Sequence, residues 1–314
     1  MMALNPKMRY FVENLLPTYP EGYTPTLTDI RSRVSSAPPG TVELVQHVED
    51  RLIPGPESDL PIRIYTPEGE GPFPLVVFFH GGGFVYGGLE SHDAVCRSIV
   101  KASQHIMVAV EYRLAPENPF PAAPDDCFAA AKWVYEHAEE LNGDKTNLSV
   151  CGDSAGGNLA TVVAQMAKEQ GGLVIVKQVL LYPVVDRYQP EKYPSYLENG
   201  TGYFLTTDAM ALFCRLYVQS EELYYHHYAA PINAPDLSGL PPALIITCEF
   251  DPLRDEGELY GEKLREAGVE TIVKREKGLI HGFFNLFSLM DSKDDIKGVY
   301  ELIGSFLKNN VLVR

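Results

Sequence analysis

A series of short, almost wholly apolar segments, separated by stretches of helix length, is the feature that most restricts the fold of this chain. The apolar segments are residues 75–79, 106–110, 148–151, 174–181, 243–248 and 271–274. Strands without polar alternation are typical of a parallel sheet that is covered on both faces. The helical stretches between them are residues 91–102, 125–140, 158–169, 255–267 and 296–307. This alternation predicts an α/β fold with a mainly parallel sheet.

The beginning of the chain has a different pattern. Residues 6–16 are helical in pattern and are followed by several prolines, which interrupt helices. Residues 41–48 and 62–65 are rich in alternating and β-branched side chains around a Pro/Gly turn, so we predict two strands there.

A second departure lies between the fourth and fifth apolar segments. Residues 186–242 contain no clear strand but many aromatic side chains and a helix-like stretch at residues 208–218. We expect this insertion to form, with the N-terminal segment, a helical cap over the mouth of the sheet. The alternative is a compact helical excursion without a functional role.

The predicted domain organisation follows from these patterns. The catalytic domain comprises residues 41–185 and 243–314, residues 1–40 form the N-terminal part of the cap, and residues 186–242 are the cap insertion. A chain of 314 residues is long enough for one large core of this kind.

The charge balance argues against a nucleic acid partner. The chain has 26 Lys and Arg against 42 Asp and Glu, a formal net charge of −16. An acidic field repels phosphate backbones, and no cluster of basic residues interrupts it. The charge says little about the substrate beyond disfavouring large polyanions.

Cysteine usage and the N-terminus bear on the compartment. The five cysteines are an odd number, widely spaced and without a CxxC pair, which argues against a disulfide framework or a zinc site. The N-terminus has no continuous apolar region of the secretory type, and no apolar run approaches the ~18 residues of a membrane span. We therefore predict a cytoplasmic protein without a membrane span.

The sequence GDSAGG at residues 152–157 lies between an apolar segment and a helical stretch. It matches the G-x-S-x-G nucleophile elbow. The turn holds the serine in a strained conformation, and side chains at Gly152 or Gly156 would collide with neighbouring backbone. The Ser154 hydroxyl would then project beside a helix N-terminus, whose amides favour developing negative charge. The alternative to a nucleophile here is an ordinary Gly-rich turn.

The sequence HGGGF at residues 80–84 directly follows an apolar segment. Consecutive glycines let backbone N–H groups approach a ligand closely, as an oxyanion hole requires. We expect the amides of Gly82, Gly83 and Ala155 to be the donors, and His80 to order the loop rather than act as a base. A flexible loop or a phosphate-binding nest is the alternative, although the Gly-Lys-Ser/Thr ending of a Walker loop is absent.

A serine nucleophile needs a base, and the base needs an orienting acid. Of the eight histidines, His281 follows a late apolar segment, on the side where open α/β sheets place their sites. Asp251 follows the segment before it, whereas Asp255 is four residues on, in the first turn of a helix. The chain order Ser154, Asp251, His281 is that of the α/β-hydrolase pattern.

These stretches together resemble the hormone-sensitive-lipase-like esterases, also called bacterial family IV. The matching sequences, in family order, are HGGGF (80–84), YRLAPE (112–117), PFPAA (119–123), GDSAGGN (152–158), DPLRD (251–255) and HGF (281–283). The resemblance implies an eight-stranded α/β-hydrolase sheet with an antiparallel second strand and a helical cap. It also implies hydrolysis of carboxylic esters with short to medium acyl chains, without a metal or organic cofactor.

For substrate contacts we predict an apolar pocket that includes Phe84, Phe204 and Leu205, with ordinary cap core as the alternative. The expected partner is a small-molecule ester, and the edge strand near residues 271–274 could pair in a homodimer. Two other functions stay open: a serine peptidase or amidase with the same triad, and a non-catalytic ligand-binding relative. A metallohydrolase is disfavoured, because the chain has no HExxH or HxxEH spacing.

Overall fold

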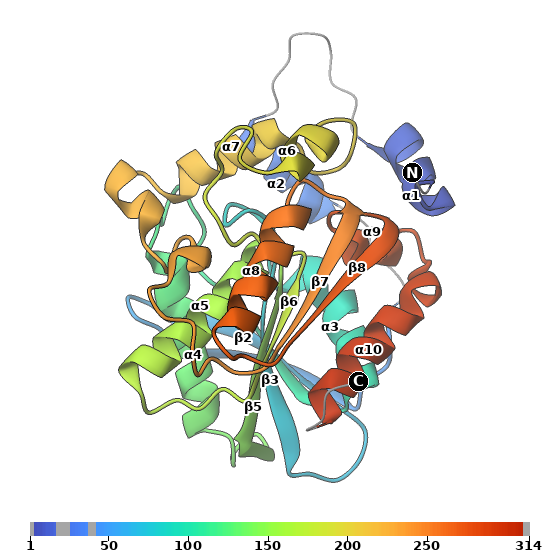
Figure 1. The fold of residues 1–314 in the computed structure, drawn as a ribbon. Coiled ribbons are helices and arrows are strands. Elements are labelled where there is room, and N and C mark those ends of the chain that lie inside the picture. Colours follow the sequence, from blue (N-terminus) through green and yellow to red (C-terminus); the bar gives the residue numbers. More distant parts are fainter. Residues whose placement is uncertain (1–2, 17–25, 37–41, 310–314) are drawn as a thin grey trace.

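The computed structural model describes residues 3–16, 26–36 and 42–309, and shows one eight-stranded sheet with helices on both faces (Figure 1). The strands are β1 (His47–Pro54), β2 (Asp59–Thr66), β3 (Phe73–Phe79), β4 (Ile106–Val110), β5 (Gly143–Asp153), β6 (Lys177–Leu181), β7 (Ala243–Phe250) and β8 (Thr271–Ile280). Their order is β1-β2-β4-β3-β5-β6-β7-β8. Strand β2 is antiparallel to both neighbours and the pairs from β4 to β8 are parallel. The mainly parallel sheet that the sequence pattern predicts, and the α/β-hydrolase form that the family resemblance implies, are thus confirmed.

The α-helices are α1 (Pro6–Tyr10), α2 (Leu27–Ser36), α3 (Leu89–Ser103), α4 (Ala122–Glu136), α5 (Ala155–Gln170), α6 (Pro194–Asn199), α7 (Thr207–Tyr217), α8 (Arg254–Glu266), α9 (Phe283–Leu289) and α10 (Lys297–Lys308). Shorter helical turns are η1 (Phe11–Leu15), η2 (Glu221–Tyr225), η3 (Pro231–Asn233) and η4 (Lys293–Ile296). The sequence correctly predicted the helices between the strands, the helical residues 6–16 and the stretch that forms α7. It did not predict α2 or α6.

Strand β3 shows why the central strands are continuously apolar. Its Leu75, Val77 and Phe79 lie in the core cluster that includes α4, α5 and α8. The alternate residues Val76 and Phe78 lie in the cluster that includes α3, α9 and α10. Both faces of the strand are therefore buried, as a parallel sheet covered by helices requires.

The strand boundaries deviate from prediction where strands are least buried. The prediction of a strand at residues 41–48 is wrong for residues 42–46, because the first strand begins at His47; residue 41 lies outside the described residues. Strand β1 is at the sheet edge and mostly exposed or half-buried, so its sequence HVEDRLIP carries little apolar pattern. At the other edge, β8 continues through polar residues to Ile280, and among the described residues it pairs with β7 alone. Strand β6 begins at Lys177, three residues after the predicted start.

Helices α2, α6 and α7 lie over the end of the sheet where the parallel strands finish (Figure 1). Helix α2 comes from the N-terminal segment, and the other two come from the insertion between β6 and β7. The division into cap and catalytic domain stays a prediction, and part of its N-terminal portion lies outside the described residues. In the described ranges, no helix has both the length and the apolar character needed to cross a membrane.

Candidate active site

Ser154 occupies the turn between β5 and α5, with φ 54° and ψ −116°. A side chain on Gly152 would overlap the backbone of Gly156, and one on Gly156 would overlap the backbone of Phe79. Both glycines are therefore required by close backbone approach. The turn leaves Ser154 Oγ at the carboxyl end of the central strand, on the rim of a cavity.

Three polar side chains from separate loops meet at this rim. His281 Nε2 lies 2.9 Å from Ser154 Oγ. His281 Nδ1 lies 2.8 Å from Asp251 Oδ2. The Asp251 carboxylate is fully buried, and its Oδ1 accepts a hydrogen bond from the Leu253 amide at 2.9 Å. The order hydroxyl, imidazole, carboxylate is the arrangement of a Ser-His-Asp triad.

The glycine loop after β3 lies beside the serine. Gly82 and Gly83 have φ values of 122° and 59°, which favour glycine. The Gly82 carbonyl accepts hydrogen bonds from the amides of Val85 and Tyr86, which closes the loop into a turn. Gly83 lines the same cavity as Ser154, and Ala155 is the first residue of α5, so its N–H lacks a partner within the helix. These positions suit amides that face a developing oxyanion.

His80 is a buried residue at the start of the glycine loop, directly after β3. Its ring stacks on Tyr112 with 4.2 Å between the centroids, and its Nδ1 lies 2.8 Å from the Gly81 carbonyl oxygen. Burial, together with the neighbouring His92, lowers the pKa of His80 to about 3. The ring is therefore neutral at physiological pH, and it packs where it orders the loop.

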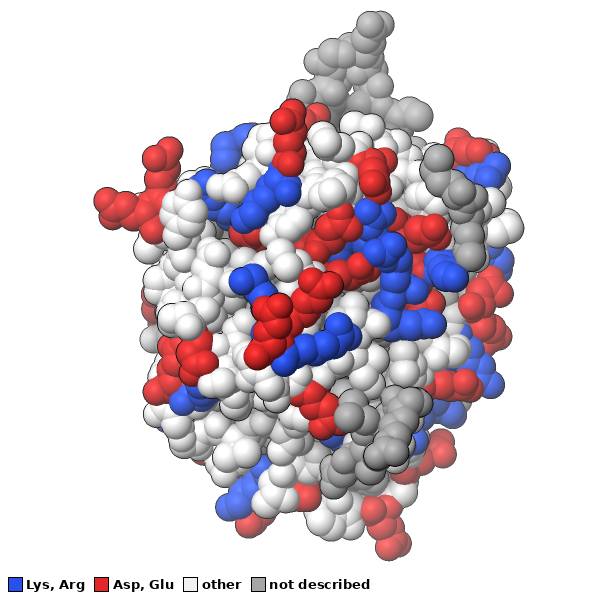
Figure 2. Space-filling view, in the orientation of Figure 1, with Lys and Arg blue, Asp and Glu red and all other residues white. Residues whose placement is uncertain are grey.

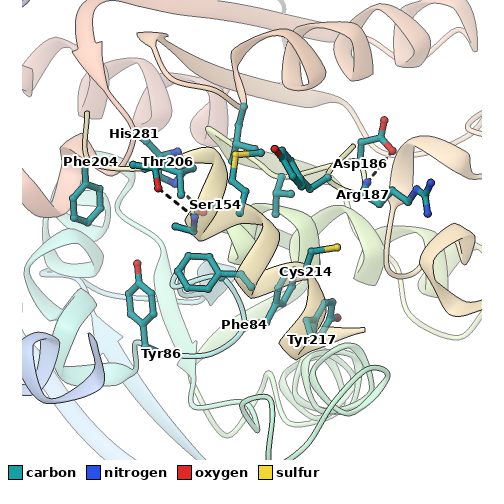
Figure 3. Close-up of a pocket in the computed structure, with 18 of the residues that line it drawn as sticks. Phe84, Tyr86, Ser154, Asp186, Arg187, Phe204, Thr206, Cys214, Tyr217 and His281 are labelled. Atoms are coloured by element: carbon teal, nitrogen blue, oxygen red, sulfur yellow. Dashed lines mark hydrogen bonds between the residues drawn. The ribbon is translucent and has the colours of Figure 1, made fainter. Parts of the chain in front are cut away.

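A cavity of about 400 Å³ is lined by Ser154 and His281 and by residues of the insertion between β6 and β7 (Figure 3). Its lining includes all three side chains predicted from the sequence: Phe84, Phe204 and Leu205. Helix α7 contributes Ala209, Met210, Phe213, Cys214 and Tyr217. Phe84 stacks face to face on Tyr217 with 3.7 Å between the ring centroids. The walls are predominantly apolar, and the Ser154 hydroxyl and the His281 imidazole are among the polar groups that line them.

Sequence reasoning missed one buried carboxylate next to Ser154. Asp153 Oδ1 accepts a hydrogen bond from the Gly81 amide at 2.8 Å and lies 3.2 Å from His92 Nε2. Burial raises the pKa of Asp153, but His92 and the Gly81 amide outweigh it, so the net shift is downward. Asp153 stands at a variable position of G-x-S-x-G, so the motif alone gives no signal for it.

Other candidates from the sequence lie apart from this centre. His227 Nε2 lies 3.1 Å from Glu169 on α5, and the His226 ring stacks on His227. Asp255 lies in the first turn of α8 and accepts a hydrogen bond from the Ser195 amide.

All five cysteines fall in the described part of the chain and are free thiols. The cytoplasmic location inferred from them stays a prediction. Within the described residues, no three His, Cys, Asp or Glu side chains are grouped so that they could hold a metal ion.

Comparison with known proteins identifies a family and several esterases that this chain resembles. A protein-family profile described as the alpha/beta hydrolase fold matches residues 76–285. The chain is 39% identical over 294 residues to carboxylesterase NlhH of Mycobacterium tuberculosis, covering 90% of this chain and 91% of the relative. It is 34% identical over 312 residues to an arylesterase of Saccharolobus solfataricus, covering 98% and 99% of the two chains. The solved structure of a hyperthermophilic esterase from the archaeon Pyrobaculum calidifontis is similar, with a TM-score of 0.86 at 38% identity, covering 98% of this chain and 100% of that one.

Proposed function

Because the chain belongs to the alpha/beta hydrolase fold family, in its hormone-sensitive-lipase-like branch of carboxylesterases, we propose that it hydrolyses short- to medium-chain carboxylic esters through Ser154, His281 and Asp251. The observation that carries the proposal is the continuous contact from Ser154 Oγ through the imidazole to the buried carboxylate.

In the first step, His281 Nε2 takes the Ser154 proton while Oγ attacks the ester carbonyl carbon. Asp251 accepts the hydrogen bond from Nδ1–H, which fixes the imidazole tautomer and stabilises the imidazolium that forms. The protonated ring then donates its Nε2 proton to the alcohol oxygen as the C–O bond breaks. This step leaves an acyl group on Ser154 and frees the alcohol.

In the second step, water attacks the acyl carbon while His281 Nε2 takes one of the water protons. The tetrahedral intermediate collapses, the proton returns to Ser154 Oγ, and the carboxylic acid leaves. In both steps the negative oxygen faces the amides of Gly82, Gly83 and Ala155. A single donor of this kind contributes on the order of 10²–10³ in rate.

The cavity favours a small ester over a long-chain lipid. A volume of about 400 Å³ is near the lower end of the usual range for small-ligand pockets. Phe84, Phe204 and Leu205 provide apolar contacts for an acyl or alcohol group of limited length. We therefore expect the highest kcat/KM with acyl chains well below the length of palmitate.

The test is a panel of p-nitrophenyl esters from acetate to palmitate, assayed with wild type and Ser154→Ala. We expect hydrolysis with a short- or medium-chain optimum, a fluorophosphonate label on the wild type alone, and loss of at least ~10⁴-fold in kcat in Ser154→Ala. Full activity in Ser154→Ala would disprove the nucleophile, and a palmitate optimum would disprove the substrate class. Preference for matched p-nitroanilides over esters would instead identify an amidase.

A further inference from the structure

Behind the proposed triad lies a second buried contact between a histidine and a carboxylate. His92 on α3 has its Nε2 3.2 Å from Asp153 Oδ1. The two residues are 5% and 3% exposed, so the contact is closed to solvent. His92 Nδ1 lies 2.9 Å from the hydroxyl oxygen of Ser91 at the start of the same helix. His92 Nε2 therefore faces the Asp153 carboxylate, while Nδ1 contacts the neighbouring Ser91 hydroxyl.

The carboxylate of Asp153 connects two of the loops used in the proposed reaction. Asp153 directly precedes Ser154, and its Oδ1 accepts the hydrogen bond from the Gly81 amide. Gly81 is followed by Gly82 and Gly83, whose amides we assign to the oxyanion. The position of Asp153 Oδ1 thus sets the distance between the glycine loop and the nucleophile turn.

His92 also reaches the loop of the proposed base. Asn285 Nδ2 on α9 lies 2.9 Å from the same ring nitrogen, His92 Nε2, which can accept from this amide only when it does not donate to Asp153. Helix α9 begins at Phe283, two residues after His281. One imidazole therefore contacts groups that belong to the nucleophile turn and to the base loop, and through Asp153 it is linked to the glycine loop.

The energetic reason for such a residue is the burial of Asp153. A buried carboxylate needs partners, and removal of one partner from a buried pair costs far more than loss of an exposed one. Without His92, the carboxylate has the Gly81 amide and the Tyr182 hydroxyl, the latter at 3.5 Å. We expect it to move or bind water, and either change shifts the Gly81 amide.

We propose that His92 is a positioning residue for ester hydrolysis: its Nε2–H holds the glycine loop in register with Ser154 through Asp153, and its ring contacts Asn285 of the helix that follows His281. This inference rests on the proposed function. His92 lies behind the loops and does not line the cavity, so it acts on the reaction only through the groups that it contacts.

The experiment compares His92→Ala, His92→Gln and wild type, with each enzyme concentration set by fluorophosphonate titration. We expect His92→Ala to lower kcat about 10- to 100-fold, since misplacement of reacting groups by a fraction of an ångström has effects of this size. KM should change less than about threefold, because the cavity walls are unaltered. His92→Gln should recover most of the loss, because its amide N–H can donate to Asp153.

A second readout separates positioning from general damage. Each variant is assayed with an ester and with the matching thionoester, whose sulfur fits an oxyanion hole poorly. We expect the ester-to-thionoester rate ratio to fall about tenfold in His92→Ala and to recover in His92→Gln. His105→Ala is the matched control: His105 is also buried, but it precedes the first residue of β4, at the amino ends of the parallel strands, whereas Ser154 lies at their carboxyl ends. It should lower the melting temperature and leave both kcat and the ratio unchanged.

Two outcomes would overturn the inference: a His92→Ala enzyme with kcat within about threefold of wild type, or an unchanged ester-to-thionoester ratio at reduced kcat. If His92→Ala does not fold, Asn285→Ala, at a half-buried position, tests the His281 side of the contact by the same assays. An unaltered kcat there would equally overturn that half. A wild type without ester hydrolysis or fluorophosphonate labelling would contradict the proposed function instead.

Discussion

Ser154 has a backbone conformation that an L-residue seldom adopts, since φ 54° with ψ −116° is close to glycine-only territory. The surrounding backbone holds it there: the Ser154 amide donates to the Leu181 carbonyl at 2.8 Å, and the Ser154 carbonyl accepts from the Val184 amide at 3.3 Å. The strain is stored in the folded state and aims the side chain at His281.

This strain predicts a difference between two inactive variants. Ser154→Ala keeps the Cβ atom and hence the strained conformation, whereas Ser154→Gly relieves it. We expect Ser154→Gly to have a free energy of unfolding about 1 kcal/mol higher than Ser154→Ala. Relief of the backbone strain in the folded state exceeds the stability lost because glycine makes the unfolded chain more flexible. Urea unfolding of both proteins measures it. A less stable Ser154→Gly would show that the turn is not strained.

At the scale of elements, the first turn of α8 holds α6 of the proposed cap. Three consecutive residues of α8 contact it: Arg254, Asp255 and Glu256. Their respective partners are the Glu198 carboxylate, the Ser195 amide and the Tyr196 hydroxyl. Glu256 also accepts hydrogen bonds from the amides of Val185 and Asp186, at the beginning of the insertion. The helix that follows Asp251 thus anchors both the start of the insertion and α6.

Glu256 makes this anchor dependent on pH. Burial raises the pKa of Glu256 to about 8 from an ordinary value of 4.5, and this outweighs the hydrogen bonds from Tyr196 and Val185. Because the folded state holds the proton more tightly than the unfolded state, the stabilisation is complete below pH 4.5 and is lost as pH rises through 8.

We therefore expect Glu256→Gln to flatten the pH dependence of stability. The wild-type melting temperature should decline more steeply than that of the variant between about pH 5 and pH 8. Only in the wild type does unfolding release a proton from the side chain of residue 256 in this pH range. Differential scanning calorimetry across that range compares the two slopes, and other titrating groups cancel in the difference. Parallel curves would mean that Glu256 is ionised throughout.

At the scale of the whole molecule, the sheet ends in strands β1 and β8. Among the described residues, β8 pairs with β7 alone; the Asn5 amide donates to the Gly278 carbonyl, and the rest of the free edge has no neighbouring strand. Figure 2 shows basic and acidic side chains interspersed on the face of the molecule that is in view, without a large patch of one sign. We expect β8 to pair with β8 of a second copy.

Light scattering after size-exclusion chromatography tests this assembly. Wild type should have twice the mass of one chain. In Ile272→Pro and Val273→Pro, one proline removes an amide that faces β7 and the other removes an amide at the free edge, because neighbouring residues alternate. One variant should therefore be a folded monomer and the other should be destabilised. A monomeric wild type would contradict the proposed dimer.

How far the sequence predicts this molecule depends on which interactions determine each part. Strands β3, β4 and β7 are apolar on both faces, so their positions are readable from composition alone. The positions of edge strand β1 and helix α2 cannot be predicted in this way, because contacts with neighbouring elements determine them rather than a local sequence pattern. Ser154, Asp251 and His281 follow strand ends and lie in contact as expected, although their roles stay proposals. His92 lies within an ordinary helix, and only its contacts with Asp153 and Asn285, distant in sequence, distinguish it.

The insertion between β6 and β7 has a consequence for how such a chain can diversify. The side chains of the proposed triad follow β5, β7 and β8, whereas α6 and α7 belong to one uninterrupted stretch, residues 186–242. Substitutions in that stretch can therefore change which ester is preferred during evolution, while the proposed catalytic residues stay the same. Transplanting the insertion from a relative, with the Glu256 contacts retained, is the corresponding laboratory route to new selectivity.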